Sequence, residues 1–347
     1  MFPVLGRVAY LNAGSVGPLS ERTVRAMRVA ESAELERGRG AMSVWDELAA
    51  EELELRQKVG ALIGVPGDLI VMTSSTTEGC NIVITGLRLG PGDEVVTTDA
   101  EHPGLSMPLL ASGATIKQAR VLERPSSEAL PAILDEVTSR TRLIALSHVL
   151  WLNGHVLPLA EIKRATGVPL LVDGAQSAGA IRVDASAADW YTVSGQKWLC
   201  GPETTGALYV AEPDALRPQI QSGAAHAYTD VRRLRLLHLA RPLMAGLSAA
   251  IGDLPEWGFD RAAALVARCR QALLGPGAEV RTEAGQGTLV SFRVPGDPVE
   301  TVRAAEDQDI VIRNLPDGWL RASVGWWNDE SDIDRLVDFL TALPSSA

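Results

Sequence analysis

Short apolar runs alternate with amphipathic stretches between residues 68 and 210 of the chain. Each run is about five or six residues long and is bounded by Gly, Pro or Asp, which is typical of strands buried on both faces. The runs cover residues 69–75, 93–99, 114–122, 142–149, 168–174, 189–195 and 206–212. Because most of the gaps between them could hold a crossover helix, the pattern predicts a mainly parallel α/β sheet.

Different patterns flank this region. Residues 45–64 form an amphipathic stretch that ends before a Gly-Val-Pro sequence, and they predict a long helix ahead of the first strand. After residue 240, helical patterns dominate 243–273. Two strand-like runs, at 288–294 and 309–314, and a last helical pattern over 329–343 follow. We therefore expect a large domain over residues 16–240 and a smaller α+β domain over residues 241–347.

Composition, charge and cysteine usage narrow the class of protein. The 347 residues are 46% hydrophobic and 22% charged, which is ordinary globular usage with room for about two domains. A net charge of −11 argues against a nucleic-acid partner, since phosphate binding needs a basic surface. The three cysteines have no CxxC or metal-ligand spacing, so we expect no metal site and a reducing, cytoplasmic location. No apolar stretch approaches ~18 residues and no signal-peptide pattern is visible, so we expect no membrane partner.

Polar residues follow the ends of several predicted strands. Ligands of open α/β sheets bind at the carboxyl ends of the strands, so these residues are the candidates for a functional site. They lie at 74–77, 99–102, 147–148, 173–176 and 194–197. Together they supply hydroxyls, two imidazoles, a carboxylate, an amide and an amine, an inventory that suits an anionic aromatic cofactor.

Each of these candidates also has a purely structural explanation. Ser75 and Glu78 match a capping box for the helix that follows, whereas the same helix N-terminus could bind a phosphate. His102 is either a hydrogen-bonded loop residue or a catalytic group. Asp173 ends an apolar strand, where it either caps the next turn or meets a cationic partner. Lys197 is either solvated or an amine in an apolar pocket, where a lowered pKa would let it form Schiff bases.

Taken together and in this order, these residues resemble the fold-type I pyridoxal-5′-phosphate enzymes. The similarity is to the class V aminotransferase and cysteine desulfurase superfamily, and it covers nearly the whole chain. VDGAQS (172–177) and SGQKWLCGP (194–202) carry most of its specificity. SHVLWLNGHVLPLAEI (147–162) is most similar to the cysteine/cystine C–S lyase branch of that superfamily.

The resemblance implies a role for each residue at the strand ends. Lys197 would form a Schiff base with pyridoxal 5′-phosphate and shuttle protons at the substrate α-carbon, and Asp173 would keep the pyridine nitrogen protonated. His102 would stack on the ring as a third catalytic residue, and Gln176 would hydrogen-bond its phenolic oxygen. The phosphate would be bound by the hydroxyls of Thr76, Thr77 and Ser194 and by the amide of Gln196.

The resemblance also implies a substrate site. Arg313 and Arg321 match the superfamily's C-terminal arginines, and in this branch both can face the substrate carboxylate, which suits bidentate guanidinium recognition. A surface ion pair is the alternative for either arginine. Asn12 is expected to reach the substrate, so the N-terminal segment 1–15 would lie near the active site.

The chain departs from the superfamily pattern in three places. Gln196 stands where a histidine usually precedes the lysine, and an amide can donate to phosphate but cannot titrate. Arg241 lies in the stretch that corresponds to a Gly-Thr-Pro turn, which in relatives reaches the partner subunit's phosphate, so that contact is expected to be altered or cationic. The loop 314–320 has no cysteine, which argues against a persulfide-forming desulfurase.

The expected function is therefore that of a C–S lyase acting on an L-cysteine-derived substrate. β-Elimination would release a sulfur species, pyruvate and ammonia. An aminotransferase or an amino-acid epimerase shares the first half of this chemistry and stays an alternative. A non-catalytic protein of the same fold is a further alternative, but such a protein would need neither Lys197 nor Asp173.

The expected partners are a small amino-acid substrate and a second copy of the chain. The homodimer is implied by the family, and the basic stretch 232–241 is interpreted as a subunit contact or a group near the partner's phosphate. Recognition of the substrate side chain is expected from loop 221–235 and from Trp326 and Trp327. Plain packing is the alternative for both tryptophans.

Overall fold

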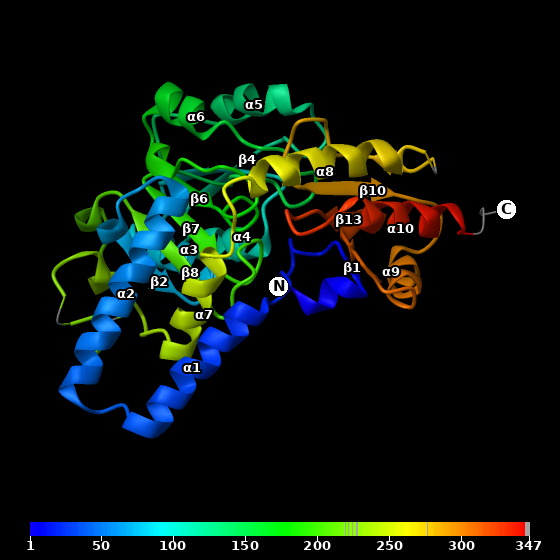
Figure 1. The fold of residues 1–347 in the computed structure, drawn as a ribbon. Helices are drawn as coiled ribbons and strands as arrows, with labels where there is room; N and C mark the ends of the chain where they lie inside the picture. Colours follow the sequence, from blue (N-terminus) through cyan, green and yellow to red (C-terminus); the bar gives the residue numbers. More distant parts are fainter. Residues whose placement is uncertain (219, 221, 224, 227, 276, 344–347) are drawn as a thin grey trace.

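A seven-stranded sheet forms the centre of the computed structural model (Figure 1), which describes all residues except 219, 221, 224, 227, 276 and 344–347. The strand order is β2-β8-β7-β6-β5-β3-β4. The strands are β2 (Ile70–Thr73), β3 (Glu94–Thr98), β4 (Thr115–Ala119), β5 (Thr141–Ser147), β6 (Leu170–Asp173), β7 (Trp190–Ser194) and β8 (Gly206–Val210). Strand β8 runs opposite to the other six strands of this sheet, which are parallel to one another, so the predicted mainly parallel α/β fold is confirmed.

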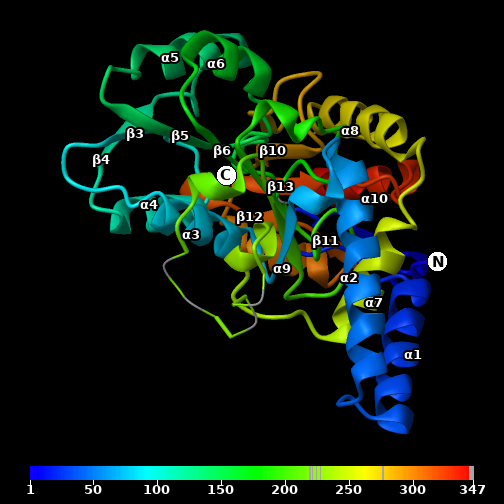
Figure 2. The same cartoon turned by 90° about the vertical axis from the view of Figure 1, so that its left-hand side faces the viewer.

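Helices cover both faces of this sheet (Figure 2). One core joins the sheet to α2 (Met42–Ile63), α5 (Ala129–Asp135) and α6 (Leu159–Thr166). A second core joins the opposite face to α3 (Thr76–Gly86) and α4 (Pro103–Ala111). Neighbouring strand residues alternate between the two cores, which is why the strands appear in the sequence as nearly continuous apolar runs.

Two long helices extend away from the body of the molecule (Figure 1). They are α1 (Glu21–Arg37) and α2, and α7 (Arg241–Ile251) packs against both. Met244 and Leu247 of α7 belong to the core of the large sheet. The domain boundary at residue 240 stays a prediction, and this packing groups α7 with the large domain.

In the described residues, a smaller sheet and three helices form the C-terminal part, which fits the predicted α+β arrangement, although the helix Pro298–Glu306 was not predicted. The sheet order is β12-β13-β10-β9, and every pair in it is antiparallel. The elements are α8 (Gly258–Leu273), β9 (Glu279–Val280), β10 (Leu289–Arg293), α9 (Pro298–Glu306), β11 (Ile310–Val311), β12 (Arg313–Asn314), β13 (Leu320–Ser323) and α10 (Glu330–Thr341). The short strand β1 (Ala9–Tyr10) pairs with β11, which ties the N-terminal segment to this part of the chain.

Seven short 3-10 helices connect these elements within the described residues. They are Pro3–Gly6, Gly67–Leu69, Ser126–Glu128, Ala185–Ala187, Pro213–Ala215, Val231–Leu234 and Pro316–Gly318. In the part of the chain that the structure describes, no helix combines the length and the apolar character that a membrane crossing requires.

Candidate active site

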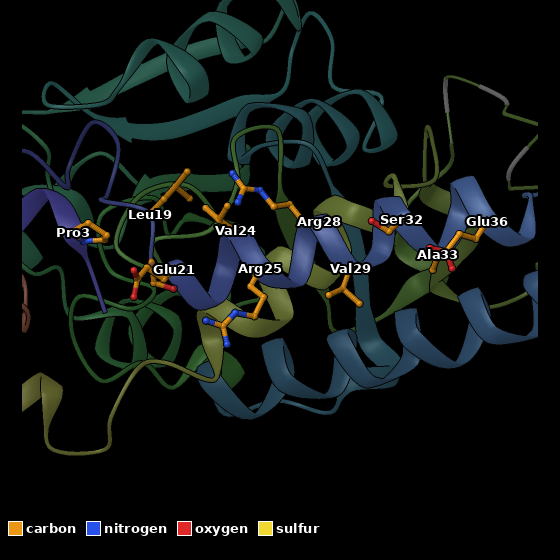
Figure 3. Close-up of a pocket in the computed structure, with 11 residues that line it drawn as sticks. Pro3, Leu19, Glu21, Val24, Arg25, Arg28, Val29, Ser32, Ala33 and Glu36 are labelled. Carbon is orange, nitrogen blue, oxygen red and sulfur yellow. The ribbon is translucent and has the colours of Figure 1, made fainter.

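The polar residues at the strand ends surround a cavity of about 200 Å³. It is lined by Gly14, Ser15, Ser75, Thr76, Thr77, His102, Trp151, Gln176, Ser194, Gln196, Lys197, Arg313 and Arg321. Most of the residues predicted from the sequence are therefore brought together, although Asn12 and Asp173 are not part of this lining. A larger hollow of about 760 Å³ lies along α1 (Figure 3), but none of the predicted site residues lines it.

Lys197 lies in a tight turn just after β7. Gly201 N–H donates to the Gly195 carbonyl (2.8 Å), and Cys200 N–H donates to the Lys197 carbonyl (3.0 Å). The segment around Gly17 packs so closely on this turn that a Cβ at Gly17 would lie 2.2 Å from the Lys197 carbonyl oxygen. Burial lowers the pKa of Lys197 to about 8, against the opposing effect of Asp173. Such an amine is partly neutral near physiological pH, as a nucleophile or base must be.

Asp173 is the last residue of β6 and is 3% exposed. Its Oδ1 accepts hydrogen bonds from Ala175 N–H (2.9 Å) and from the Thr192 hydroxyl (3.5 Å). The carboxylate therefore caps the following turn, as one interpretation of the sequence proposed. Among the described residues, none donates to Oδ2, so the second oxygen is left for a cationic partner.

The N-terminus of α3 reaches the cavity with its hydroxyl residues. Ser75 is the N-cap, and its side chain accepts from Glu78 N–H (3.1 Å). Glu78 does not return the bond to Ser75, because its carboxylate accepts from the backbone N–H and hydroxyl of Ser74 instead. Only half of the predicted capping box forms, and the N-terminal N–H groups beside Thr76 and Thr77 favour an anion.

The amides of two glutamines are oriented by the protein. Gln176 accepts from the Trp198 indole N–H (3.0 Å) and donates to the Gly14 carbonyl (2.9 Å), so one further amide N–H remains. The Oε1 atom of Gln196 accepts from the Ser194 hydroxyl (3.0 Å), which leaves its NH₂ group as a donor. These donors suit the phenolic oxygen and the phosphate that the sequence assigned to them.

His102 is the N-cap of α4, and its Nδ1 accepts from Gly104 N–H (3.0 Å). A neutral ring with this bond carries its proton on Nε2, an assignment made from the bonding pattern. Burial lowers the pKa of His102, and the charge of Lys197 lowers it further. The rings of His102 and Trp151 form a T-shaped pair with a centroid distance of 5.2 Å and an interplanar angle of 80°. A neutral, braced imidazole is suited to stack on an aromatic cofactor.

Glu101 fixes the loop that carries His102. Its carboxylate accepts from the backbone N–H (3.0 Å) and hydroxyl (2.6 Å) of Ser147, and from the Thr98 hydroxyl (2.6 Å). Burial raises the pKa of Glu101 to about 7, and these hydrogen bonds oppose that rise. The bonds join the end of β3 to the end of β5, next to Asp173 in the sheet register.

The guanidinium groups of Arg313 and Arg321 also line the cavity. Arg321, on β13, is 1% exposed and donates to the Trp151 carbonyl (3.4 Å) and the Ser15 hydroxyl (3.2 Å). Arg313 is exposed and donates to the same hydroxyl (2.9 Å). Among the side chains that the structure describes, no carboxylate lies within ion-pair distance of either arginine. A buried guanidinium without a carboxylate is costly unless an anion binds there.

Sequence reasoning missed three residues that line this cavity, namely Gly14, Ser15 and Trp151. Ser15 lies three residues after Asn12 in the N-terminal segment, and its hydroxyl donates to the Asn12 side chain (2.8 Å). The structure thus places Asn12 behind Ser15 rather than in the lining. Trp151 lies within the 147–162 motif, and its indole N–H is buried without a hydrogen-bond partner among the described atoms. The signal for Trp151 was its position inside a motif already singled out, and the signal for Gly14 and Ser15 was their place in the segment 1–15, which was expected near the active site.

The stretch 232–241 is not a free basic surface. Arg241 is paired with Glu47 and Glu51 of α2, and Arg235 is paired with Glu52. The turn is cationic in sequence, but within this chain the charge of Arg241 is neutralised. The residues at 221, 224 and 227 of the predicted recognition loop lie outside the described residues. Both predicted recognition tryptophans, Trp326 and Trp327, pack against Phe2 instead of lining the cavity.

The three cysteines are buried and free. Burial raises the pKa of Cys80 and Cys200 well above the usual thiol value, and it raises that of Cys269 to about 12. A buried thiol of raised pKa is a poor nucleophile. Within the described residues, no group of three or more His, Cys, Asp or Glu side chains is arranged to hold a metal ion.

Known proteins resemble this chain in sequence and in fold. The family model described as Aminotransferase class-V matches residues 18–275. A probable cysteine desulfurase of Methanothermobacter thermautotrophicus is 35% identical, and the match covers 60% of this chain and 54% of that protein. An isopenicillin N epimerase of Amycolatopsis lactamdurans is 28% identical, over 97% of this chain and 95% of the relative.

A solved structure matches over nearly the whole length. It is the complex between the cystine C–S lyase C-DES and its reaction product cysteine persulfide. The TM-score is 0.93 at 29% identity, and the match covers 99% of this chain and 100% of that one. The chain thus spans about half the length of the desulfurase and almost all of the epimerase and the lyase.

Proposed function

Since the chain belongs to the class V aminotransferase family, we propose that it is a C–S lyase acting on an L-cysteine-derived substrate. Family membership confirms the predicted fold-type I enzyme, and its cofactor is pyridoxal 5′-phosphate. The observation that carries the proposal is the cavity itself. It combines one amine of lowered pKa with two guanidinium groups and contains no cysteine.

The donors around the cavity fit this cofactor. The hydroxyls of Thr76 and Thr77, the NH₂ group of Gln196 and the N-terminus of α3 would hold a phosphate dianion. The Ser194 hydroxyl, which donates to Oε1 of Gln196, would orient that NH₂ group. Asp173 would hold a proton on the pyridine nitrogen through its free Oδ2. His102 would cover one ring face, and the remaining N–H of Gln176 would bind the phenolic oxygen. When bound, pyridoxal phosphate supplies an electron sink for the bonds at the α-carbon of an amino acid.

Lys197 is the acid–base group of the proposed reaction. Its amine would anchor the cofactor and, once displaced by the amino group of the substrate, would take the proton from the α-carbon. A pKa of about 8 suits both steps, because the amine is neutral in a useful fraction of molecules near pH 7 and still basic enough to accept a proton.

Arg321 and Arg313 would bind the substrate carboxylate. Two cations without a protein carboxylate can take a carboxylate through several charge-assisted hydrogen bonds. Binding there would fix the α-carbon beside Lys197, and the β-carbon with its sulfur would extend toward the cavity mouth.

The fate of the sulfur separates a lyase from a persulfide-forming desulfurase. The desulfurase route needs a nucleophilic cysteine near the substrate, but all three cysteines of this chain are buried away from the cavity lining. In the proposed reaction the C–S bond breaks after α-proton removal, and the sulfur leaves with the electron pair. The remaining three-carbon fragment is then hydrolysed to pyruvate and ammonia.

An amino-acid epimerase is the second candidate, because an isopenicillin N epimerase aligns over 97% of this chain. Epimerisation by two bases needs proton donors on both faces of the α-carbon. Besides the two arginines, Lys197 and His102 are the only titratable side chains among the described lining residues, and His102 lies where the cofactor ring is expected. This arrangement favours one-base elimination.

Incubation with L-cystine or S-substituted cysteines tests the proposal. The lyase is expected to release pyruvate and ammonia continuously without any 2-oxo acid, because elimination returns the cofactor unchanged. A coupled pyruvate assay measures this, with a Lys197→Ala variant as the inactive control. An aminotransferase would instead stop after one turnover until a 2-oxo acid is added, and an epimerase would yield the D-isomer without pyruvate. Either result would replace the lyase assignment.

A further inference from the structure

The hydroxyl of Ser15 is a junction between the N-terminal segment and both substrate-facing arginines. Its oxygen accepts from Nη1 of Arg313 (2.9 Å) and from Nη2 of Arg321 (3.2 Å), and its O–H donates to Oδ1 of Asn12 (2.8 Å). A hydroxyl has one proton and two lone pairs. All of this capacity is used, so the bond to Asn12 turns both lone pairs toward the guanidinium groups.

The backbone around Ser15 is held from several sides. Ser15 N–H donates to the Asn12 carbonyl (2.9 Å), and Asn12 bridges to Ser323 on the strand that carries Arg321. Gly17 N–H donates to the Gln196 carbonyl (2.7 Å), next to Lys197. The hydroxyl therefore has a defined position relative to both the arginines and the lysine.

The approach of Arg321 to this segment depends on a glycine. A Cβ at Gly14 would lie 2.8 Å from Nη2 of Arg321, which is closer than real contacts allow. The glycine thus lets the guanidinium reach Ser15. The two guanidinium groups share one neutral acceptor, so their positive charges are not neutralised by the protein. A substrate carboxylate would supply the compensating negative charge.

We propose that Ser15 is a positioning residue that holds Arg313 and Arg321 together as one clamp for the substrate carboxylate, with Asn12 setting the direction of its hydroxyl. The inference rests on the proposed function only in requiring an amino-acid substrate. Asn12 then contributes to substrate binding through Ser15 and not by direct contact.

Glycine and glycinamide are suitable probes, because they differ in the carboxylate and need no C–S cleavage. Each is titrated into the cofactor-bound enzyme, and the change in cofactor absorbance gives its apparent affinity. The parent enzyme is expected to prefer glycine. Ser15→Ala should reduce that preference by ~10-fold or more, the size expected for lost hydrogen bonds to charged groups. Ser15→Thr keeps the hydroxyl and should retain most of the preference, and Asn12→Ala should reduce it less than Ser15→Ala does.

Ser248→Ala is the matched control. The Ser248 hydroxyl also accepts from a cation, Lys58 (2.7 Å), but it lies on α7 outside the cavity lining. This variant should keep the full preference for glycine. With L-cystine as the substrate, Ser15→Ala should raise KM and leave kcat near that of the parent, because the clamp acts equally in the ground and transition states.

An unchanged glycine preference in Ser15→Ala would overturn the proposal. So would an equal loss in Ser15→Thr and Ser15→Ala with matching falls in thermal stability, since that would indicate a structural role alone. If Ser15→Ala does not fold, Asn12→Ala decides: a reduced preference for glycine over glycinamide supports the proposal, and an unchanged preference overturns it. Absence of pyruvate from L-cystine with an intact glycine preference would refute the lyase assignment and leave the Ser15 inference standing.

Discussion

Replacing Arg321 by methionine is expected to make the protein more stable while removing substrate recognition. The guanidinium is 1% exposed, and its Nε has no hydrogen-bond partner among the described atoms. Burial and, to a smaller extent, the neighbouring charge of Arg313 together lower the pKa of Arg321 to about 9. The charged form is therefore held in the folded state at a cost that the substrate carboxylate would offset.

The magnitude follows from that pKa. At about 1.4 kcal/mol per pH unit, the fall from the ordinary arginine value of 12.5 to about 9 costs the folded state on the order of 5 kcal/mol. The two hydrogen bonds to Ser15 and the Trp151 carbonyl offset roughly 1 kcal/mol each. Methionine fills much of the same volume without a charge. We expect Arg321→Met to raise the free energy of unfolding by ~1–3 kcal/mol in the absence of substrate.

The pH dependence of the free energy of unfolding provides a second test of the predicted stabilisation by Arg321→Met. Below pH 9 the guanidinium is charged in both the folded and the unfolded chain, so the cost is fully present at neutral pH. Above pH 9 the unfolded chain binds the proton more tightly than the folded one, and the parent gains stability relative to the variant. The stability advantage of Arg321→Met should therefore shrink as the pH rises above 9.

The functional effect should be large and opposite in direction. Loss of charge-assisted bonds to the carboxylate should lower kcat/KM by ~100–1000-fold, with the cofactor absorbance unchanged. Thermal unfolding and steady-state kinetics measure the two effects. Arg268→Met is the control, because Arg268 forms an exposed ion pair with Asp334, of little expected consequence for either quantity. A variant that unfolds at a lower temperature than the parent and keeps its kcat/KM would refute both parts of this reasoning.

Three further predictions concern the cofactor and the assembly. The rate at which cofactor-free protein takes up pyridoxal phosphate should rise with pH up to about 8 and level off above it, because only the neutral amine of Lys197 reacts. A rate that stays flat from about one pH unit below that value to about one unit above it would contradict this assignment, and so would borohydride labelling of another lysine. Asp173→Asn should lower turnover by ~100-fold or more, on the order of 3 kcal/mol of transition-state stabilisation, with little loss of bound cofactor. Near-normal turnover would mean that Asp173 serves only as a turn cap. Light scattering of the cofactor-bound protein should give the mass of a homodimer, and a fully active monomer would remove that prediction.

The strands of the large sheet were predictable because both of their faces are buried. Each of the seven apolar runs contains a strand of the central sheet, and the strand ends lie within a few residues of the predicted bounds. The direction of β8 was not predictable, because an apolar run buried on both faces looks the same whichever way the strand runs. The run 309–314 was predicted as one strand, but β11 pairs with β1 and β12 pairs with β13.

In the active site too, some features were predictable from local sequence patterns and others were not. Lys197, Asp173 and His102 follow strand ends, and parallel strands bring their carboxyl ends to one edge, so local patterns were enough to group them. Ser15 and Arg321 are 306 positions apart, and neither has a local pattern that marks the other as a partner.

By itself, the sequence determined the strand set, the cofactor-facing residues and the family resemblance, because these depend on burial periodicity and on short motifs. Only the tertiary structure decided that one hydroxyl joins both arginines, that Arg241 is neutralised by α2 and that Trp326 and Trp327 pack away from the cavity. Those outcomes depend on contacts between distant segments, which fix distances of a few ångströms that no local pattern encodes.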